Sequence, residues 1–210
     1  MTNHVREIGT ARCSTCGKCP CPVLEPEAFP KAESWTRGSW MQTFTGRKFY
    51  PMDPRAEEVD RVDIAHALSL LCRYNGHVDR FYSVAEHCVH LSYAVPPQDA
   101  LWALLHDATE AYVGDMIRPL KHHMPDYVTA EANVMLAIAQ RFDLPIPVDM
   151  PASVKDADNR ILLDERATLM REPVEPWGVD GLEPLGVKIH GWRPERAEHY
   201  YLARLRELTT

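Results

Sequence analysis

The sequence contains no long hydrophobic run. No apolar stretch approaches the roughly 18–20 residues that cross a bilayer. The N-terminus, Met1-Thr2-Asn3-His4-Val5, also lacks the basic stretch followed by an apolar stretch that marks a secretion signal. These absences predict a cytoplasmic protein with no membrane partner. In that reducing compartment, cysteines act as thiols or metal ligands rather than as disulfides.

Basic residues are also scarce. The chain has 23 Lys and Arg residues against 30 Asp and Glu residues, which gives a net charge of −7. Binding to a nucleic-acid backbone relies on clustered Lys and Arg, so this balance argues against DNA or RNA as the main partner. A single nucleotide is still compatible with it, because one or two cations in a pocket are enough to bind a phosphate.

Sustained alternation of apolar and polar residues is missing as well, whereas helical periodicity recurs after residue 41. We therefore predict an all-α domain over residues 41–210. Asp63 can cap a helix that ends near Asn75-Gly76, and Ser83 with Glu86 forms an S-x-x-E capping box for a helix over 83–95. Further helices are predicted at about 98–114, 125–142, 152–170 and 194–208, about six in all, and the Pro- and Gly-rich residues 172–194 are predicted to form a long loop.

Residues 1–40 differ from the rest, with several prolines and little apolar periodicity, so they are predicted to form an irregular extension. The extension holds four cysteines within nine residues, a density that can bind one structural zinc ion. No second C-x-x-C pair follows at the usual distance, so unbound thiols and an iron–sulfur cluster stay open as alternatives. The four candidate ligands are Cys13, Cys16, Cys19 and Cys21.

The segment from Leu104 to Glu110 carries the strongest chemical signal. On a helix, His106 and Glu110 are four residues apart, and Asp107 and Glu110 are three apart, so all three can lie on one side. That side borders an apolar stripe, where charged groups need partners, and a divalent cation can satisfy several of them at once. A His-Asp dipeptide alone is weak evidence, because a hydrogen-bonded pair in the core would look the same.

Three further positions extend this set. His87 lies early in the helix capped by Ser83, Asp158 lies on the helix over 152–170, and Asp115 directly follows a glycine. Two imidazoles and two carboxylates from separate helices form a mixed nitrogen and oxygen set. Such a set suits a divalent transition ion that keeps positions open for water and a phosphate oxygen.

The order of these motifs resembles the HD superfamily of phosphohydrolases. It is most similar to the bacterial 5′-deoxynucleotidases and to related phage enzymes that hydrolyse deoxynucleotides. The resemblance covers about residues 60–170. It is carried, in order, by Ala85-Glu86-His87, His106-Asp107-Ala108-Thr109-Glu110, Gly114-Asp115, Pro119-Leu120-Lys121 and Lys155-x-Ala157-Asp158.

The resemblance implies a helical HD domain that forms homo-oligomers and uses Co²⁺, Mn²⁺, Zn²⁺ or Fe²⁺. It also implies hydrolysis of the 5′-phosphate ester of 2′-deoxynucleotides, with dATP giving deoxyadenosine and triphosphate in the phage relatives. The site residues that it implies are His87, His106, Asp107 and Asp158 as metal ligands, Glu110 and Asp115 as catalytic carboxylates, and Arg73 and Lys121 as phosphate-binding cations.

Two neighbours of Arg73 are further candidates for substrate binding. Tyr74 stands where the family often has a tryptophan, and His77 lies close enough in sequence to touch the substrate. Arg73 alone would also suit a residue that caps the end of its helix. Glu110 would equally suit a residue that orients one of the two histidines rather than one that transfers a proton.

Three other functions stay open at this point. A cyclic-nucleotide or signalling-nucleotide phosphodiesterase is one, although the second histidine set of a two-metal site is not evident. A slow, regulatory nucleotide-binding module is another. The third is an interaction protein whose Cys-rich extension docks a partner.

Overall fold

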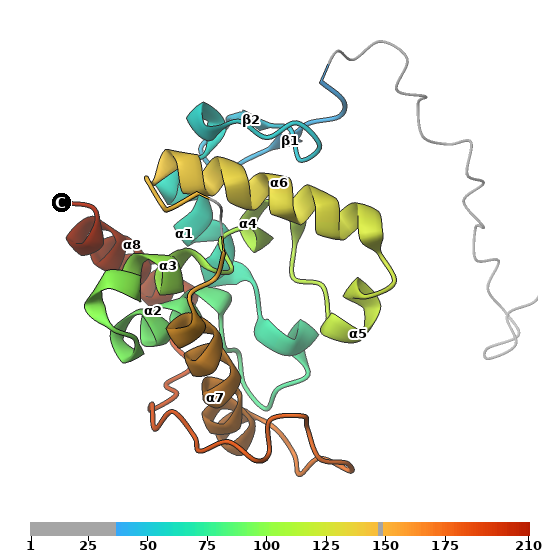
Figure 1. Ribbon diagram of the computed structural model, residues 1–210, viewed down its shortest axis with the longest axis vertical. Coiled ribbons are helices and arrows are strands. Elements are labelled where there is room, and N and C mark those ends of the chain that lie inside the picture. Colours follow the sequence, from blue (N-terminus) through green and yellow to red (C-terminus); the bar gives the residue numbers. More distant parts are fainter. Residues whose placement is uncertain (1–36, 147–148) are drawn as a thin grey trace, which may run out of the picture. The chain divides into compact units, whose positions relative to one another are not determined.

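The computed structural model describes residues 37–146 and 149–210, and these residues are mostly helical (Figure 1). This confirms the predicted all-α class. Cys13, Cys16, Cys19 and Cys21, the candidate zinc ligands, lie outside the described residues. Within the described part, no helix combines the length and the apolar character that a membrane span requires.

The described chain begins with a small antiparallel hairpin of β1 (Met41–Gln42) and β2 (Lys48–Phe49). Short 3₁₀ turns occur at Ala56–Glu58, Arg73–Gly76 and Pro97–Asp99. The helices are α1 (Arg61–Leu70), α2 (Val84–Ala94), α3 (Ala100–Leu105), α4 (Glu110–Val113), α5 (Arg118–Lys121), α6 (Pro125–Arg141), α7 (Ala152–Leu169) and α8 (Pro194–Leu208).

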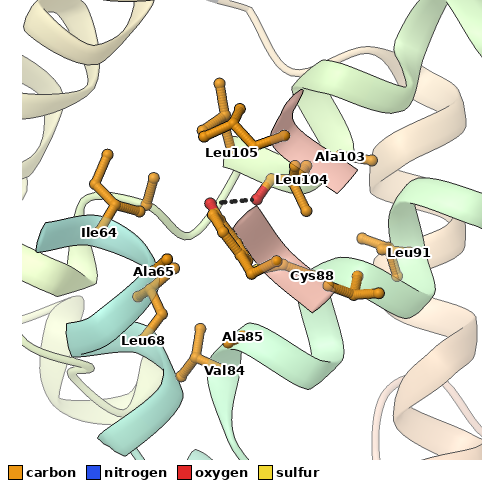
Figure 2. Packing of buried hydrophobic residues seen from close by; sticks show 14 of the residues in the cluster. Ile64, Ala65, Leu68, Val84, Ala85, Cys88, Leu91, Ala103, Leu104 and Leu105 are labelled. Atoms are coloured by element: carbon orange, nitrogen blue, oxygen red, sulfur yellow. Dashed lines mark hydrogen bonds between the residues drawn. The ribbon is translucent and has the colours of Figure 1, made fainter. Parts of the chain in front are cut away.

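The core lies where α1, α2, α3 and α8 pack together. Figure 2 shows Ile64 and Leu68 of α1 facing Val84 of α2, with Leu104 of α3 completing the cluster, and all four side chains are fully buried. The buried Tyr201 of α8 donates a hydrogen bond to the Leu104 carbonyl oxygen at 2.9 Å. Helix α2, which carries His87, and helix α3, which directly precedes His106 and Asp107, are therefore held by the core.

Helix α1 begins and ends at other residues than predicted. Asp60 is the N-cap, and its carboxylate accepts from the Val62 amide at 2.8 Å. Asp63 is buried instead, and it accepts from the amide and the hydroxyl of Thr45 at 2.7 and 2.9 Å. The prediction of Asp63 as the cap was wrong because either aspartate fits the local pattern, and the contact with the hairpin decides between them.

The predicted continuation of α1 to residue 76 was also wrong. After Leu70 the chain turns back along the start of α2, where the Arg73 amide bonds to the Tyr82 carbonyl at 2.9 Å. Tyr74 and Asn75 adopt left-handed backbone conformations with φ of 56° and 50°, which a helix cannot contain. Arg73 therefore lies in a separate turn and does not cap α1.

The helix predicted over 98–114 is divided into α3 and α4. Between them, the Ala108 amide bonds to the Leu105 carbonyl and the Glu110 amide to the Asp107 carbonyl, which are the i to i+3 contacts of tight turns. The His106 ring favours this break, because its Nδ1 lies 2.8 Å from a carbonyl oxygen that a continuous helix would use for the amide of residue 107. The expectation of one straight helix over 106–110 was therefore wrong.

The predicted start of α2 and the predicted loop over 172–194 are both confirmed. Ser83 accepts from the Glu86 amide at 3.1 Å, as a capping residue does. The Glu86 carboxylate does not complete a capping box, however. It is fully buried and accepts from the backbone amides of residues 190–192 at 2.5–2.9 Å, which ties the end of the long loop to α2.

Candidate metal centre

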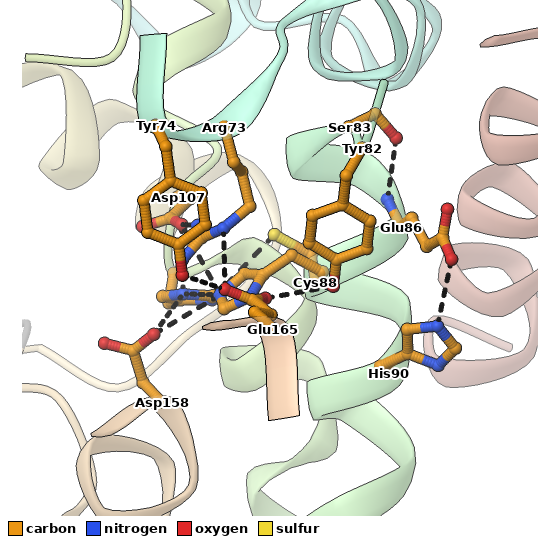
Figure 3. Close-up of polar contacts among 12 residues, drawn as sticks. Arg73, Tyr74, Tyr82, Ser83, Glu86, Cys88, His90, Asp107, Asp158 and Glu165 are labelled. Atoms are coloured by element: carbon orange, nitrogen blue, oxygen red, sulfur yellow. Dashed lines mark hydrogen bonds and ion pairs between the residues drawn. The ribbon is translucent and has the colours of Figure 1, made fainter. Parts of the chain in front are cut away.

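The four side chains predicted as metal ligands converge from three elements. His87 comes from α2, and His106 and Asp107 follow α3. Asp158 comes from α7, and Figure 3 labels the two aspartates of the set. His87 Nε2 lies 3.3 Å from His106 Nε2 and 3.3 Å from Asp158 Oδ1, and His106 Nε2 lies 3.2 Å from Asp107 Oδ2. The cross distances from His87 to Asp107 and from His106 to Asp158 are 3.8 and 3.9 Å.

These separations fit donors that share one cation. For metal–ligand bonds of about 2.1 Å, two ligand atoms lie about 3.0 Å apart at a right angle and about 3.4 Å apart at the tetrahedral angle. Three of the observed separations, 3.2–3.3 Å, fall within this range, and the two cross distances of 3.8 and 3.9 Å exceed it. His87, His106 and Asp158 also form a group whose donor atoms all lie within 4.8 Å of one another.

The second ring nitrogen of each histidine has an acceptor of its own. His87 Nδ1 lies 2.6 Å from Glu165 Oε1, and His106 Nδ1 lies 2.8 Å from the Ala103 carbonyl oxygen. A carboxylate and a carbonyl can only accept, so each Nδ1 carries a proton. In the neutral rings, both Nε2 lone pairs are therefore directed toward the same point, which is the usual arrangement of histidine metal ligands.

Cys88 forms a second group with His106 and Asp107 whose donor atoms lie within 4.8 Å of one another, but it approaches a different nitrogen of His106 from the one that lies near His87. Its thiol lies 3.9 Å from His106 Nδ1, on the side of the ring that faces away from the cluster. Burial also raises the pKa of Cys88 to about 11, so the group remains a thiol and not the thiolate that binds metals.

The charges of the site are balanced within a small volume. Burial raises the pKa of Asp107, but the His106 charge outweighs it and holds this pKa far below its usual value. Burial likewise raises the pKa of Asp158, whereas the adjacent imidazoles of His87 and His106 lower it, with a net lowering. For His106, burial lowers the pKa but the Asp107 carboxylate raises it well above its usual value. Without a metal ion, a proton on His106 thus balances the carboxylates, and a divalent cation would replace that proton.

Arg73 lies directly beside these ligands. Its Nη1 is 3.3 Å from Asp107 Oδ2 and its Nε is 3.3 Å from Glu165 Oε2, and only 11% of the side chain is exposed. A buried guanidinium next to a candidate metal centre is suited to bind a phosphate oxygen. Its place in the structure excludes helix capping, and its contact with phosphate stays a prediction.

The two neighbours of Arg73 lie further from the ligands. The Tyr74 hydroxyl donates to Glu165, and its ring lies 6.1 Å from the ring of Trp177 in the long loop. His77 and Trp177 both line a hollow of about 510 Å³ beyond Tyr74. His77 thus faces a space beside the site, and its predicted contact with substrate stays a prediction.

Glu110 and Asp115 are carboxyl groups of the site whose pKa values are raised. Burial, followed by the charges of Asp107 and Asp115, raises the pKa of Glu110 well above its usual value. Its buried Oε2 atom has no hydrogen-bond partner among the described residues. Burial also raises the pKa of Asp115. Glu110 does not orient either histidine, because both Nδ1 atoms have other acceptors, so that alternative was wrong.

Lys121 is not brought into the ligand cluster. Its ammonium forms an ion pair with Glu131 of α6 and lies 5.8 Å from the centre of the Tyr127 ring. The charge of Lys121 opposes the upward shift in the pKa of Asp115 that burial causes. Lys121 is therefore placed on the Asp115 side of the site, and its contact with phosphate stays a prediction.

Sequence reasoning missed Glu165, which is fully buried in the middle of this site. It belongs to no motif that we recognised. The available signal was its spacing, because Glu165 follows Asp158 by seven residues, or two helical turns, and so lies on the same face of α7. Burial raises the pKa of Glu165, but Arg73 and His87 lower it to about 2, so the group is an ionised carboxylate.

Comparison with known proteins identifies relatives but no activity. No model of a protein family matches the sequence. The chain is 42% identical over 141 residues to the uncharacterized protein YfdR of Escherichia coli (strain K12). The aligned region covers 67% of this chain and 78% of that protein. The chain belongs to the YfdR family. It is also 36% identical over 132 residues to the uncharacterized protein RCAP_rcc00048 of Rhodobacter capsulatus, which covers 57% of this chain and 67% of that protein.

Proposed function

We propose that this member of the YfdR family is a metal-dependent phosphohydrolase of the HD type that acts on small nucleotides. One observation carries the proposal. The Nε2 atoms of two buried histidines, each with Nδ1 committed to an acceptor, lie 3.3 Å apart and next to the carboxylates of Asp107 and Asp158. A hydrogen-bonded core pair would need neither the second histidine nor the second carboxylate.

The donor set indicates which ion these residues would hold. Two nitrogen and two oxygen donors favour a transition ion such as Co²⁺, Mn²⁺, Zn²⁺ or Fe²⁺ over Mg²⁺, which prefers oxygen ligands. When bound, such an ion polarises a phosphate oxygen and lowers the pKa of water.

Arg73 supplies the positive charge for the phosphate. Its bonds to Asp107 and Glu165 hold the guanidinium plane next to the candidate metal centre. The N–H groups of a guanidinium form a rigid fork that matches two phosphate oxygens, so the arginine both binds the substrate and stabilises charge on it.

Glu110 supplies a proton. Burial, followed by the charges of Asp107 and Asp115, raises its pKa well above the usual value, and its buried Oε2 has no hydrogen-bond partner among the described residues, which favours this carboxyl group as the proton donor. In the proposed reaction, water attacks the α-phosphorus, the bond from phosphorus to the 5′-oxygen breaks, and a protonated carboxyl group gives a proton to the leaving 5′-oxygen. Asp115, whose pKa is also raised, is the second candidate for this role.

The proposed size of the substrate rests on the charge of the chain. The proposed chemical class of the substrate rests on the resemblance. A net charge of −7 and one largely buried arginine beside the candidate ligands suit one nucleotide better than a polymer. The preference for 2′-deoxynucleotides, and an active homo-oligomer, rest on the resemblance to the 5′-deoxynucleotidases.

The test is the release of phosphate and nucleoside from a panel of dNMPs and dNTPs, first with Co²⁺ or Mn²⁺ and then with chelator. Nucleoside and phosphate from monophosphates alone would identify a 5′-deoxynucleotidase, whereas deoxyadenosine and triphosphate from dATP would identify a triphosphohydrolase. Asp107→Ala is expected to abolish either activity. If nothing in the panel is hydrolysed in a metal-dependent way, the proposal is wrong and a nucleotide-binding module becomes the better interpretation.

A further inference from the structure

Glu165 is a buried carboxylate that receives hydrogen bonds from four side chains. They come from the chain before α2, from α2 itself and from the turn after α1, as Figure 3 shows. The donors are His87 Nδ1 at 2.6 Å, the Tyr82 hydroxyl at 2.9 Å, Arg73 Nε at 3.3 Å and the Tyr74 hydroxyl.

The two oxygens of Glu165 divide these partners by role. Oε1 accepts from His87, a candidate metal ligand, and from Tyr82. Oε2 accepts from Arg73, the candidate phosphate-binding cation, and from Tyr74. One rigid carboxylate therefore contacts both halves of the candidate site.

Helix α7 also holds the His87 ring from both sides. Asp158 lies 3.3 Å from its Nε2, and Glu165, two turns later on the same helix, lies 2.6 Å from its Nδ1. A hydrogen bond of this kind at the far nitrogen sets the orientation of a metal-binding imidazole and increases its basicity. The direction of the His87 lone pair therefore depends on Glu165.

We propose that Glu165 is a positioning residue that sets the affinity for the metal and the affinity for phosphate together. Through Oε1 it fixes the ring of His87, and through Oε2 it fixes the guanidinium of Arg73 beside Asp107. The predicted effect on metal affinity depends only on the candidate ligands. The predicted effect on phosphate affinity rests on the proposed function.

The experiment compares the wild-type chain with Glu165→Gln, using Co²⁺ and inorganic phosphate as probes. Co²⁺ is titrated into the metal-free protein, and phosphate is then titrated into the Co²⁺-loaded protein by its effect on the visible spectrum. We expect a loss of Co²⁺ affinity of about 10–100-fold and a weaker binding of phosphate. Nitrogen NMR of the metal-free variant should show that the proton of His87 is no longer confined to Nδ1.

Asp63→Asn is the matched control, because Asp63 is also a buried carboxylate but has the hairpin residue Thr45 as its partner. It should lower stability without changing either affinity. Equal Co²⁺ affinity in Glu165→Gln and the wild type, together with a loss of stability like that of Asp63→Asn, would show that Glu165 only packs and would overturn the proposal.

Two milder variants test whether Oε1 acts on metal binding and Oε2 on phosphate binding. They also keep the proposal testable if Glu165→Gln does not fold. Tyr82→Phe removes a donor from Oε1 and should affect Co²⁺ binding more, whereas Tyr74→Phe removes a donor from Oε2 and should affect phosphate more. The reverse order would contradict the division. If Glu165→Gln weakens Co²⁺ binding but the wild-type chain hydrolyses no nucleotide, the positioning of His87 stands and the proposed function fails.

Discussion

Glu86 provides the sharpest test of how the long loop is held on the domain. Its carboxylate is fully buried. Oε1 accepts from the amides of His190 and Gly191, and Oε2 accepts from the amide of Trp192. In Glu86→Gln, one oxygen is replaced by an NH₂ group that faces an N–H donor, so at least one bond to a charged acceptor is lost and a donor is left unsatisfied. With about 1.5–3 kcal/mol for a hydrogen bond to a charged group, we expect a loss of about 2–4 kcal/mol in unfolding free energy.

The pH dependence of this loss follows from the pKa of Glu86. Burial raises this pKa, but the hydrogen bond from His90 and those from the backbone of Trp192 and His190 lower it below its ordinary value of 4.5. A carboxylate with a lowered folded-state pKa stabilises the fold above its unfolded pKa and loses this contribution as the pH falls through the folded value. The difference between the wild type and Glu86→Gln should therefore shrink below about pH 4.5.

The assay is urea denaturation at pH 7 and pH 4, with chelator present because Glu86 directly precedes the candidate ligand His87. Glu198→Gln is the control, since Glu198 is partly exposed and pairs with His66 alone within the described part of the chain, and we expect it to cost less than about 1 kcal/mol. A cost below about 1 kcal/mol for Glu86→Gln, or a difference that does not shrink in acid, would refute this account of the loop.

Two further predictions concern the candidate site. Arg73→Lys keeps the charge but loses the planar fork, so we expect KM for the nucleotide to rise by roughly tenfold; an unchanged KM in steady-state kinetics would contradict the role of Arg73. Burial and then the charges of Asp107 and Asp115 raise the pKa of Glu110. Over a range of pH the folded state therefore keeps a proton that the unfolded chain releases, so the free energy of unfolding falls as the pH rises above the unfolded pKa. Glu110→Gln should remove this fall and stabilise the metal-free protein at neutral pH. The prediction is wrong if denaturation at pH 4 and pH 8 shows the same fall in the wild type and in Glu110→Gln.

Local patterns in the sequence were enough to predict the helical class, the cap at Ser83 and the loop after α7. A capping hydroxyl bonds to an amide three residues later, and prolines and glycines exclude helix wherever they are frequent, so both signals act within a few residues. The order of His87, His106, Asp107 and Asp158 was also readable, because their types and spacing do not depend on how the helices pack. The HD assignment and the enzymatic activity remain predictions.

Tertiary contacts alone decided the rest. Asp60 and Asp63 are equivalent in the local pattern, and the contact of Asp63 with Thr45 separates them. The spacing of Glu165 from Asp158 indicates only a shared face of α7, since the partners of Glu165 lie 78 to 92 residues away in the chain and only packing brings them to one carboxylate. Short-range hydrogen bonds are visible in sequence because the chain itself sets their distance, whereas the neighbours of a buried carboxylate are set by how helices meet.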